Sequence, residues 1–304
     1  MNKVNGLIDI INEKSLGTYK ENVSMKTLTT YKTGGNAKLL VYPNNVESLK
    51  EMLKYIKSNN INYKIFGNGS NILASSKEYD GVIIKLTNLK ALKQEGELIE
   101  VEAGYNFALL ANNVSREGYS GLEFACGIPA TVGGAVYMNA GAYLSDVSAI
   151  LTKVDILDEN LELKTIDNKD LDFSYRHSIF MEKNWIILKA YFKVKKGNKE
   201  EIISLIEDRK RRRLSSQPLE YPSAGSVFRN PENNYAGKLI EDSNLKGYTH
   251  GGGQISDKHA NFIINKNNAT SEDIKELMDL AKKEVEKNYG ITLHVEQELF
   301  NWEK

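Results

Sequence analysis

The sequence is short of the residues that build disulfides and metal sites. Its 304 residues include one cysteine, Cys126, and four histidines, at positions 177, 250, 259 and 294. One cysteine cannot close an intrachain disulfide or supply a multi-thiolate site, which fits a reducing compartment, and the cytoplasm is the simplest assignment. The histidines show no metal-ligand spacing, so we predict no metal site.

The chain also has no excess of charge of either sign and no long apolar stretch. Forty basic residues balance forty acidic ones, which leaves no global field to hold a nucleic acid or an anionic membrane. Nowhere do about 20 apolar residues run together, so we predict no transmembrane helix. Val4, Leu7, Ile8 and Ile11 recur at helical spacing with polar residues between them, which indicates an amphipathic helix and not a signal peptide. The expected partner is a small molecule; the oligomeric state stays open, with a monomer favoured.

In the first half of the chain, helical and strand-like patterns alternate. A helical face at 46–56 is followed by strand-like segments at 63–66, 81–86 and 98–101, and Asn106 is placed to cap a further helix that ends near Gly118. More strands are expected at 154–157 and 185–194.

The second half begins with a charged helix at 199–214, and we place a domain boundary near residue 200. Thr270 and Asp273 resemble a capping box for a helix that Gly290 terminates. The alternation over 291–299 predicts a closing strand, with Gln297 on one face and the glutamates on the other.

Two segments are rich in glycine. Gly67–Asn71 follows a predicted strand, and its small residues favour either a backbone nest for an anion such as a pyrophosphate or an ordinary Gly-Asn turn. The segment 121–143 carries five glycines and a proline. Helix interiors disfavour glycine by about 1 kcal/mol and proline by about 3 kcal/mol, so backbone contact with a long cofactor explains 121–143 better than tight helix packing. The chain has neither a Rossmann fingerprint nor a Walker A motif, so another fold would hold a dinucleotide.

Three segments, 30–37, 67–73 and 121–143, resemble in order and spacing the flavin-binding motifs of the UDP-N-acetylenolpyruvoylglucosamine reductase (MurB) family. The resemblance covers roughly residues 24–300 and is closest to the shorter, type II form. It implies an α+β fold: a two-lobed FAD-binding domain of the vanillyl-alcohol oxidase/PCMH type at 1–200 (lobes about 1–88 and 89–200), then a smaller α+β substrate-binding domain at 201–304. Packing of the last strand back on the FAD domain stays open as an alternative.

The resemblance also implies FAD, held non-covalently, and NADPH as its reductant. The residues it assigns to the cofactor are Tyr31, Thr33, Gly34, Gly67, Asn68, Gly69, Ser70, Asn71, Gly127, Pro129, Thr131, Gly133, Gly134, Ala135, Asn139 and Gly141.

The implied reaction reduces the enolpyruvyl double bond of UDP-N-acetylglucosamine enolpyruvate to give UDP-N-acetylmuramate, a peptidoglycan precursor. Ser226, in the segment 222–231, matches the family's proton donor, and Arg176 matches an arginine suited to the substrate carboxylate. Glu296 matches a carboxylate that polarises the enol intermediate. This chain has Val295 where the family usually has proline, so Glu298 stays open as the alternative.

Further residues resemble the nucleotide-sugar site: Tyr175, Lys238, Asn230 and Gln254. One arginine of 209–213, with Arg213 the first choice, is expected to reach a phosphate of FAD or substrate. His177 is expected to be a structural hydrogen-bonding residue. Two other hypotheses remain: a flavin-dependent oxidase of the same superfamily, and a flavin-binding protein without catalysis.

Overall fold

The structure is a computed structural model that describes residues 3–303, and it divides the chain into two compact units. The first unit consists of residues up to Glu21, Lys38–Asn68 and Asp80–Arg211, and the second of Asn22–Ala37, Gly69–Tyr79 and Arg212 onward. The division after Arg211 falls within the charged helix α5 (Lys199–Ser216). The second unit therefore takes two segments from the first third of the chain.

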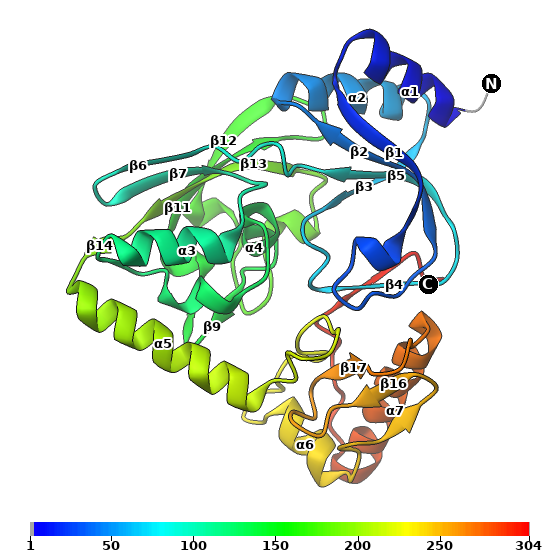
Figure 1. Ribbon diagram of the computed structural model, residues 1–304, viewed down its shortest axis with the longest axis vertical. Helices are drawn as coiled ribbons and strands as arrows, with labels where there is room; N and C mark the ends of the chain where they lie inside the picture. Colours follow the sequence, from blue (N-terminus) through cyan, green and yellow to red (C-terminus); the bar gives the residue numbers. More distant parts are fainter. Residues whose placement is uncertain (1–2, 304) are drawn as a thin grey trace. The chain divides into compact units, whose positions relative to one another are not determined.

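The first lobe of the first unit is built on a four-stranded sheet with the order β1-β2-β5-β3 (Figure 1). Its strands are β1 (Gly17–Ser24), β2 (Asn36–Pro43), β5 (Tyr79–Lys85) and β3 (Asn62–Phe66), and its helices are α1 (Lys3–Glu13) and α2 (Val46–Ser58). The Asn45 side chain caps α2 by accepting a hydrogen bond from the Ser48 amide at 2.9 Å. β3 and β5 pair in parallel, as expected for strands joined by a crossover connection.

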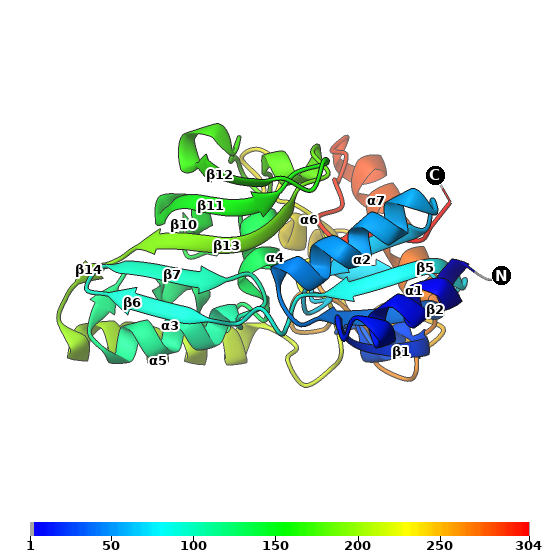
Figure 2. The ribbon, with the colours of Figure 1, turned by 90° about the horizontal axis from the view of Figure 1, so that it is seen from above.

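The second lobe is a five-stranded antiparallel sheet with the order β12-β11-β13-β7-β6 (Figure 2). The strands are β12 (Leu163–Asp167), β11 (Leu151–Leu157), β13 (Ile186–Lys193), β7 (Leu98–Glu102) and β6 (Leu92–Glu95). Helix α3 (Phe107–Arg116) begins at the predicted cap, where Asn106 accepts from the Leu109 amide at 2.8 Å. Its apolar face packs on the sheet, and the rings of Phe107 and Phe192 lie 6.3 Å apart.

The glycine-rich segment 121–143 contains helical turns, which the sequence argument had disfavoured. They are η2 (Glu123–Gly127) and the short helix α4 (Val132–Tyr137), and they are followed by a small hairpin of β9 (Gly141–Ala142) and β10 (Ser145–Asp146). Position 133, inside α4, favours glycine because a Cβ there would stand only 3.0 Å from the Cβ of Ala103. Close packing on the neighbouring backbone therefore outweighs the low helix propensity of glycine.

Several short elements complete the first unit. They are η3 (Val147–Ala149), η4 (Asn168–Asp170), η5 (Ile179–Met181) and the paired strands β8 (Tyr119–Ser120) and β14 (Lys195–Lys196).

The second unit packs helices against a three-stranded sheet with the order β15-β16-β17. Its elements are η1 (Met25–Thr27), β4 (Ile72–Ala74), α6 (Ala236–Asp242), β15 (Thr249–His250), β16 (Gly253–Ile255), β17 (Ile263–Asn265), α7 (Ser271–Tyr289) and β18 (Glu298–Phe300). The predicted capping box of α7 is confirmed, since Thr270 and Asp273 each accept from the other's amide. Gly290 ends α7 in the left-handed conformation with φ of 67°, which glycine adopts without strain.

The strand predicted over 291–299 is largely wrong. Only β18, at its end, is a strand, and Val295 makes an isolated bridge with Phe228. β18 pairs in parallel with β4, which the first half of the chain supplies and which belongs to the second unit. The backbone between α7 and β18 changes partner along its length, so no single ladder runs through it.

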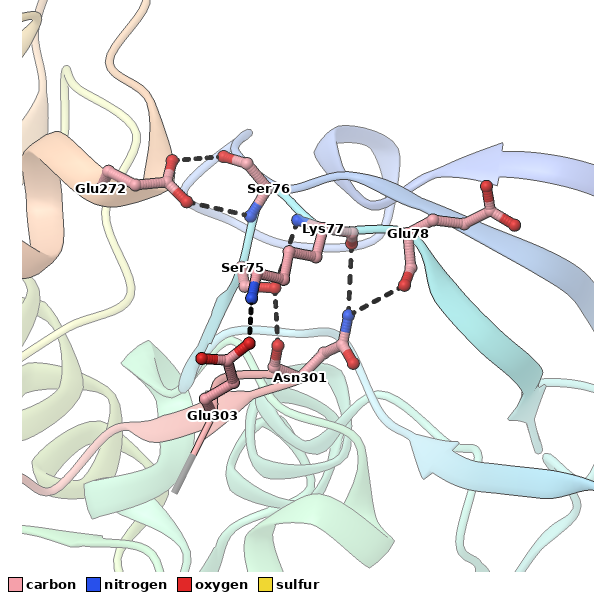
Figure 3. A network of polar contacts seen from close by, with 7 residues as sticks. All are labelled: Ser75, Ser76, Lys77, Glu78, Glu272, Asn301 and Glu303. Carbon is pink, nitrogen blue, oxygen red and sulfur yellow. Dashed lines mark hydrogen bonds and ion pairs between the residues drawn. The ribbon is translucent and has the colours of Figure 1, made fainter.

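Polar contacts reinforce the junction of β4 and β18 inside the second unit (Figure 3). Ser75 Oγ donates to Asn301 O at 2.7 Å, and Asn301 Nδ2 donates to Lys77 O at 3.2 Å. Ser76 donates to the Glu272 carboxylate on α7 through both its amide and its hydroxyl. The segment 69–79 is thereby tied to the end of the chain and to α7.

Each unit has its own hydrophobic core among the described residues. One cluster joins α1–α4 to the two large sheets, and the other joins α6 and α7 to Tyr31, Leu73 and the segment around Ser226. Within 3–303, no helix is both long enough and apolar enough to cross a membrane.

Candidate active site

In the first unit, the two glycine-rich segments lie against each other. Asn68 Nδ2 donates to Pro129 O at 3.0 Å, and a Cβ on Gly67 would stand 2.7 Å from Thr131 Oγ1. That oxygen is held in place, because it accepts from the Gly134 amide at 3.2 Å as the N-cap of α4. Position 67 is therefore restricted to glycine by its neighbour, which keeps two lengths of backbone close together.

The residues expected at the cofactor in this unit fall into two groups. Gly67, Asn68, Gly127, Pro129, Gly133, Gly134 and Gly141 are partly or fully accessible, whereas Thr131, Ala135 and Asn139 are buried. The accessible group has little side chain, so a long ligand would lie against backbone, and the buried group braces that backbone from behind. This arrangement fits a dinucleotide held through main-chain contacts, as FAD would be. The Gly133 amide donates to Ala103 O at 2.8 Å, so this amide stabilises the fold and is already hydrogen-bonded within the protein.

Cys126, in the same segment, is not poised for thiolate chemistry. Burial, assisted by the Glu123 carboxylate, raises the pKa of its thiol to about 11. The thiol therefore stays protonated at neutral pH.

Arg176 lies at the tip of a two-residue hairpin in the first unit. The backbones of Ser174 and His177 pair on either side of it, and Arg176 itself has φ of +57°. That left-handed conformation costs a non-glycine residue about 1–2 kcal/mol, so contacts must hold it. The guanidinium donates from Nη2 to Gly141 O at 2.8 Å and lies 5.2 Å from the ring centre of Tyr175. Arg176 is thus joined to the last part of the glycine-rich segment.

Side chains on both flanks hold this hairpin. Asn139 Nδ2 donates to Ser174 O at 2.9 Å, so the buried Asn139 supports Arg176 and its side chain is not directed to a ligand. His177 Nδ1 lies 3.1 Å from Asp172 O, and its Nε2 lies 3.2 Å from Glu182 Oε1. The expectation that His177 is a structural hydrogen-bonding residue agrees with these contacts.

In the second unit, Ser226 and Glu296 lie on neighbouring backbone segments. The bridge between Phe228 and Val295 and the hydrogen bond from the Glu296 amide to Val227 O, at 2.8 Å, set the two segments side by side. Residues 70 positions apart in sequence are brought to one place by this pairing. Ser226 and Glu296 are both partly accessible.

Glu298 occupies a different environment within the second unit. Its amide donates to Asn71 O at 2.8 Å, and it pairs with Ile72 of β4. Of the two glutamates that the sequence left open, Glu296 is the one whose backbone is bonded to the segment of Ser226.

The segment 30–37, which resembles a flavin motif, buries alternate side chains in the second unit. Tyr31 is fully buried, and its hydroxyl donates to Gln297 Oε1 at 3.1 Å. Thr33 is also buried. Gly34 has φ of +118°, and a Cβ there would stand 2.7 Å from the Cβ of Met25. The expected cofactor contact of the Tyr31 side chain has no exposed surface through which to form, because the phenol fills the core.

Three more expected cofactor residues belong to the same unit. Gly69 has φ of +65°, and a Cβ there would stand 2.1 Å from Leu28 O. Asn71 Nδ2 donates to Glu296 O at 3.2 Å, and Ser70 is partly accessible. Asn71 therefore supports the candidate catalytic glutamate directly.

The residues expected at the nucleotide sugar have protein partners in this structure. Asn230 Oδ1 accepts from the Ala236 amide at 3.1 Å, at the start of α6. Lys238 forms an exposed ion pair with Asp242. Gln254 is buried; its Nε2 donates to Gly247 O at 3.0 Å, and its Oε1 accepts from Lys266 at 2.8 Å. Tyr175 is exposed.

Two features of the site were not found from the sequence. The Arg209 guanidinium lies 4.7 Å from the ring centre of Tyr143, whose hydroxyl donates to Arg209 O at 3.0 Å. Asn261 holds the segment after Ser226, since its carbonyl and side chain bond to Val227 and Phe228. In both cases the partners are distant in sequence, so no local motif predicts the contact.

Comparison with known proteins first gives the class. A family model described as "FAD binding domain" matches residues 37–167, which cover most of the first unit. Together with the two lobes, this defines an FAD-dependent oxidoreductase of mixed α and β structure. A variant of Phl p 4, a glucose oxidase, has a TM-score of 0.50 at 12% identity over 66% of this chain and 45% of its own, which shows the fold alone.

The family follows from the whole chain. The C-terminal domain model of UDP-N-acetylenolpyruvoylglucosamine reductase matches residues 217–300. The reductase of Caldanaerobacter subterraneus subsp. tengcongensis is 44% identical over 90% of both chains, and that of Bacillus subtilis is 41% identical over 96% of this chain and 97% of its own. The crystal structure of the Thermus caldophilus enzyme has a TM-score of 0.81 at 32% identity, and covers 93% of this chain and all of its own. The chain belongs to the UDP-N-acetylenolpyruvoylglucosamine reductase (MurB) family.

Proposed function

We propose that this protein reduces UDP-N-acetylglucosamine enolpyruvate to UDP-N-acetylmuramate at the expense of NADPH, in peptidoglycan precursor synthesis. The names of its relatives support the reaction, and the "FAD binding domain" match supports the cofactor. The observation that carries the proposal is the pairing of the Ser226 and Glu296 segments. A cytoplasmic location follows from the proposal, because the nucleotide sugar and NADPH are cytoplasmic metabolites.

The reaction adds a hydride and a proton across a carbon–carbon double bond. FAD, when bound and reduced by NADPH, supplies the hydride. The chain must then stabilise the negative charge that grows on the substrate carboxylate and must deliver one proton to the adjacent carbon.

Three side chains of the chain are proposed for these tasks. The Ser226 hydroxyl donates the proton, which a strongly basic carbanion can accept even from a weak acid. The Arg176 guanidinium binds the carboxylate and the charge that develops on it, a task for which its planar fork is suited. Glu296 polarises the enol.

Around the flavin, the accessible backbone of Gly67, Gly133 and Gly134 would lie against the ligand, and Asn68 would keep the two segments together. In the second unit, Lys238, Asn230 and Gln254 are proposed for the nucleotide sugar, and Arg213 is proposed for a phosphate.

Anaerobic stopped-flow absorbance tests the proposal, because it separates flavin reduction by NADPH from flavin reoxidation by the enolpyruvyl sugar. Ser226→Ala is expected to leave reduction unchanged and to slow reoxidation by several orders of magnitude. Ser243→Ala is the matched control and should reoxidise normally, because the hydroxyl it removes donates to Leu239 O at the end of α6 and accepts from Asn288 Nδ2 on α7.

Unchanged reoxidation in Ser226→Ala would remove that serine from the mechanism. Rapid oxygen consumption without turnover of the enolpyruvyl sugar would instead indicate an oxidase. A yellow protein that NADPH does not reduce would indicate flavin binding without this catalysis, and the same experiment with NADH reports the preferred reductant.

A further inference from the structure

One buried side chain, Gln297, holds the backbone on which Ser226 lies. Gln297 is 4% exposed, and its Nε2 lies 3.1, 3.2 and 3.4 Å from the carbonyl oxygens of Ala224, Gly225 and Ser226. Its two N–H groups are shared among these three acceptors. A single side-chain amide therefore fixes the orientation of three consecutive carbonyl groups, the last of which belongs to the candidate proton donor.

The orientation of this amide follows from the chemistry of its neighbours. Carbonyl oxygens only accept hydrogen bonds, so the NH₂ group must face Ala224, Gly225 and Ser226. The amide oxygen then faces Tyr31, whose hydroxyl donates to it at 3.1 Å. The opposite orientation would set a carbonyl oxygen against three others.

Tyr31 is itself fixed from two sides. Its ring is fully buried in the core of the second unit, and its carbonyl accepts from Asn265 Nδ2 at 2.9 Å. Burial raises the pKa of its hydroxyl, so the hydroxyl stays protonated and donates its hydrogen bond to Gln297. Since a buried polar atom without a partner is unfavourable, the Tyr31 hydroxyl and the Gln297 amide each hold the other in a single orientation.

The Ser226 segment needs such support, because Gly225 has φ of +76° and a Cβ there would touch nothing within 4 Å. The left-handed conformation at Gly225 is one that glycine adopts without strain, and no packing surrounds the side where a Cβ would stand. On the far side of Ser226, Asn261 holds Val227 and Phe228. Gln297 is the matching support on the near side.

We propose that Gln297 and Tyr31 act as one positioning unit for Ser226: the Tyr31 hydroxyl orients the Gln297 amide, and the amide fixes the Ala224–Ser226 backbone so that the serine hydroxyl reaches the carbon it protonates. This inference rests on the proposed function and deepens it. It gives Tyr31, in a segment that resembles a flavin motif, a role in proton delivery. Neither residue touches the substrate in this account.

The test uses Tyr31→Phe and Gln297→Met in the FAD-loaded enzyme. Tyr31→Phe removes one hydroxyl and keeps the ring, and Gln297→Met keeps the volume and removes every hydrogen bond of the amide. Reoxidation by the enolpyruvyl sugar is expected to slow about tenfold in Tyr31→Phe and about a hundredfold in Gln297→Met, since small misplacements of a reacting group have effects of this size. Flavin reduction by NADPH should keep its wild-type rate in both variants.

Two further measurements separate positioning from general loss of stability. The double variant should reoxidise no more slowly than Gln297→Met alone, because Tyr31 acts only through the amide. Tyr191→Phe is the matched control, because it removes a partly buried tyrosine hydrogen bond, to Asp155 Oδ2 at 2.8 Å, in the sheet of the first unit; both half-reactions should be unchanged.

Equal slowing of both half-reactions in Tyr31→Phe, or additive effects in the double variant, would overturn the inference. So would normal reoxidation in Tyr31→Phe and Gln297→Met while Ser226→Ala reoxidises slowly, and in that case the proposed function would stand. Normal reoxidation in Ser226→Ala would instead show that the proposed function is at fault.

Discussion

The substitution Gly67→Ala tests the close approach of the two glycine-rich segments. The added Cβ would stand 2.7 Å from Thr131 Oγ1, a separation that real Cβ atoms essentially never show. Relief requires the Thr131 side chain to turn away, which breaks its hydrogen bond to the Gly134 amide and uncaps α4. Overpacking costs about 1–3 kcal/mol of unfolding free energy, and loss of a cap costs about 1 kcal/mol.

Gly67→Ala is therefore expected to lower the unfolding free energy by about 2 kcal/mol and to weaken FAD retention. Urea denaturation of the apoprotein measures the first effect, and flavin fluorescence released on dilution measures the second. Removing the obstructing hydroxyl should recover part of the loss, so the double variant with Thr131→Ala should be less destabilised than the sum of the single variants.

Gly197→Ala is the control, because its Cβ would stand 3.2 Å from the end of the Ile202 side chain and 3.6 Å from Ser120 Cβ, which are milder contacts than the one at position 67. It should keep both FAD and stability. If Gly67→Ala unfolds and retains flavin like the wild type, or if the two substitutions at 67 and 131 are additive, the steric account of this segment is wrong.

Four further predictions follow from the contacts described above. Asn139→Ala removes the hydrogen bond to Ser174 O, so reoxidation by the enolpyruvyl sugar should slow about tenfold while the reduction rate is kept; equal slowing of both steps would contradict a role in holding the Arg176 hairpin. Cys126 should alkylate about a hundredfold more slowly in the native protein than in urea at pH 9, because the native pKa of about 11 leaves roughly 1% thiolate. The raised pKa of that thiol also means that its contribution to stability is full below pH 9 and is lost as the pH rises towards 11, which denaturation at two alkaline pH values would show by comparison with Cys126→Ala. Thr270→Ala breaks the capping box of α7 and should lower the unfolding free energy by about 1 kcal/mol in urea denaturation, with no change in either half-reaction.

Elements with local signals could be predicted from the sequence. The capping box at Thr270, the cap at Asn106 and the end of α7 at Gly290 all appear where the residue types indicate, because each depends on hydrogen bonds within one turn. The segment 291–299 shows the limit of alternation as a signal. Its alternation of apolar and polar residues is typical of a strand, yet its amides bond first to the Ser226 segment and then to Asn71.

The roles of individual site residues were harder to predict, because family motifs do not say which way a side chain points. Tyr31 and Asn139 lie in segments that resemble flavin motifs, but their side chains are buried and bonded to Gln297 and Ser174. Those partners are distant in sequence, and only the folded chain shows them.

The composition of the second unit has a consequence for how the protein is made. Residues 22–37 and 69–79 leave the ribosome early, yet their partners on α7 and β18 are among the last to be synthesised. At about 5–20 residues per second, these early segments wait for some tens of seconds, and during that interval Tyr31 and Leu73 lack the core that buries them in the finished protein. In a fragment that stops at residue 200, Tyr31 and Leu73 would stay exposed permanently. The flavin-binding half should therefore aggregate when it is expressed without the C-terminal part of the chain.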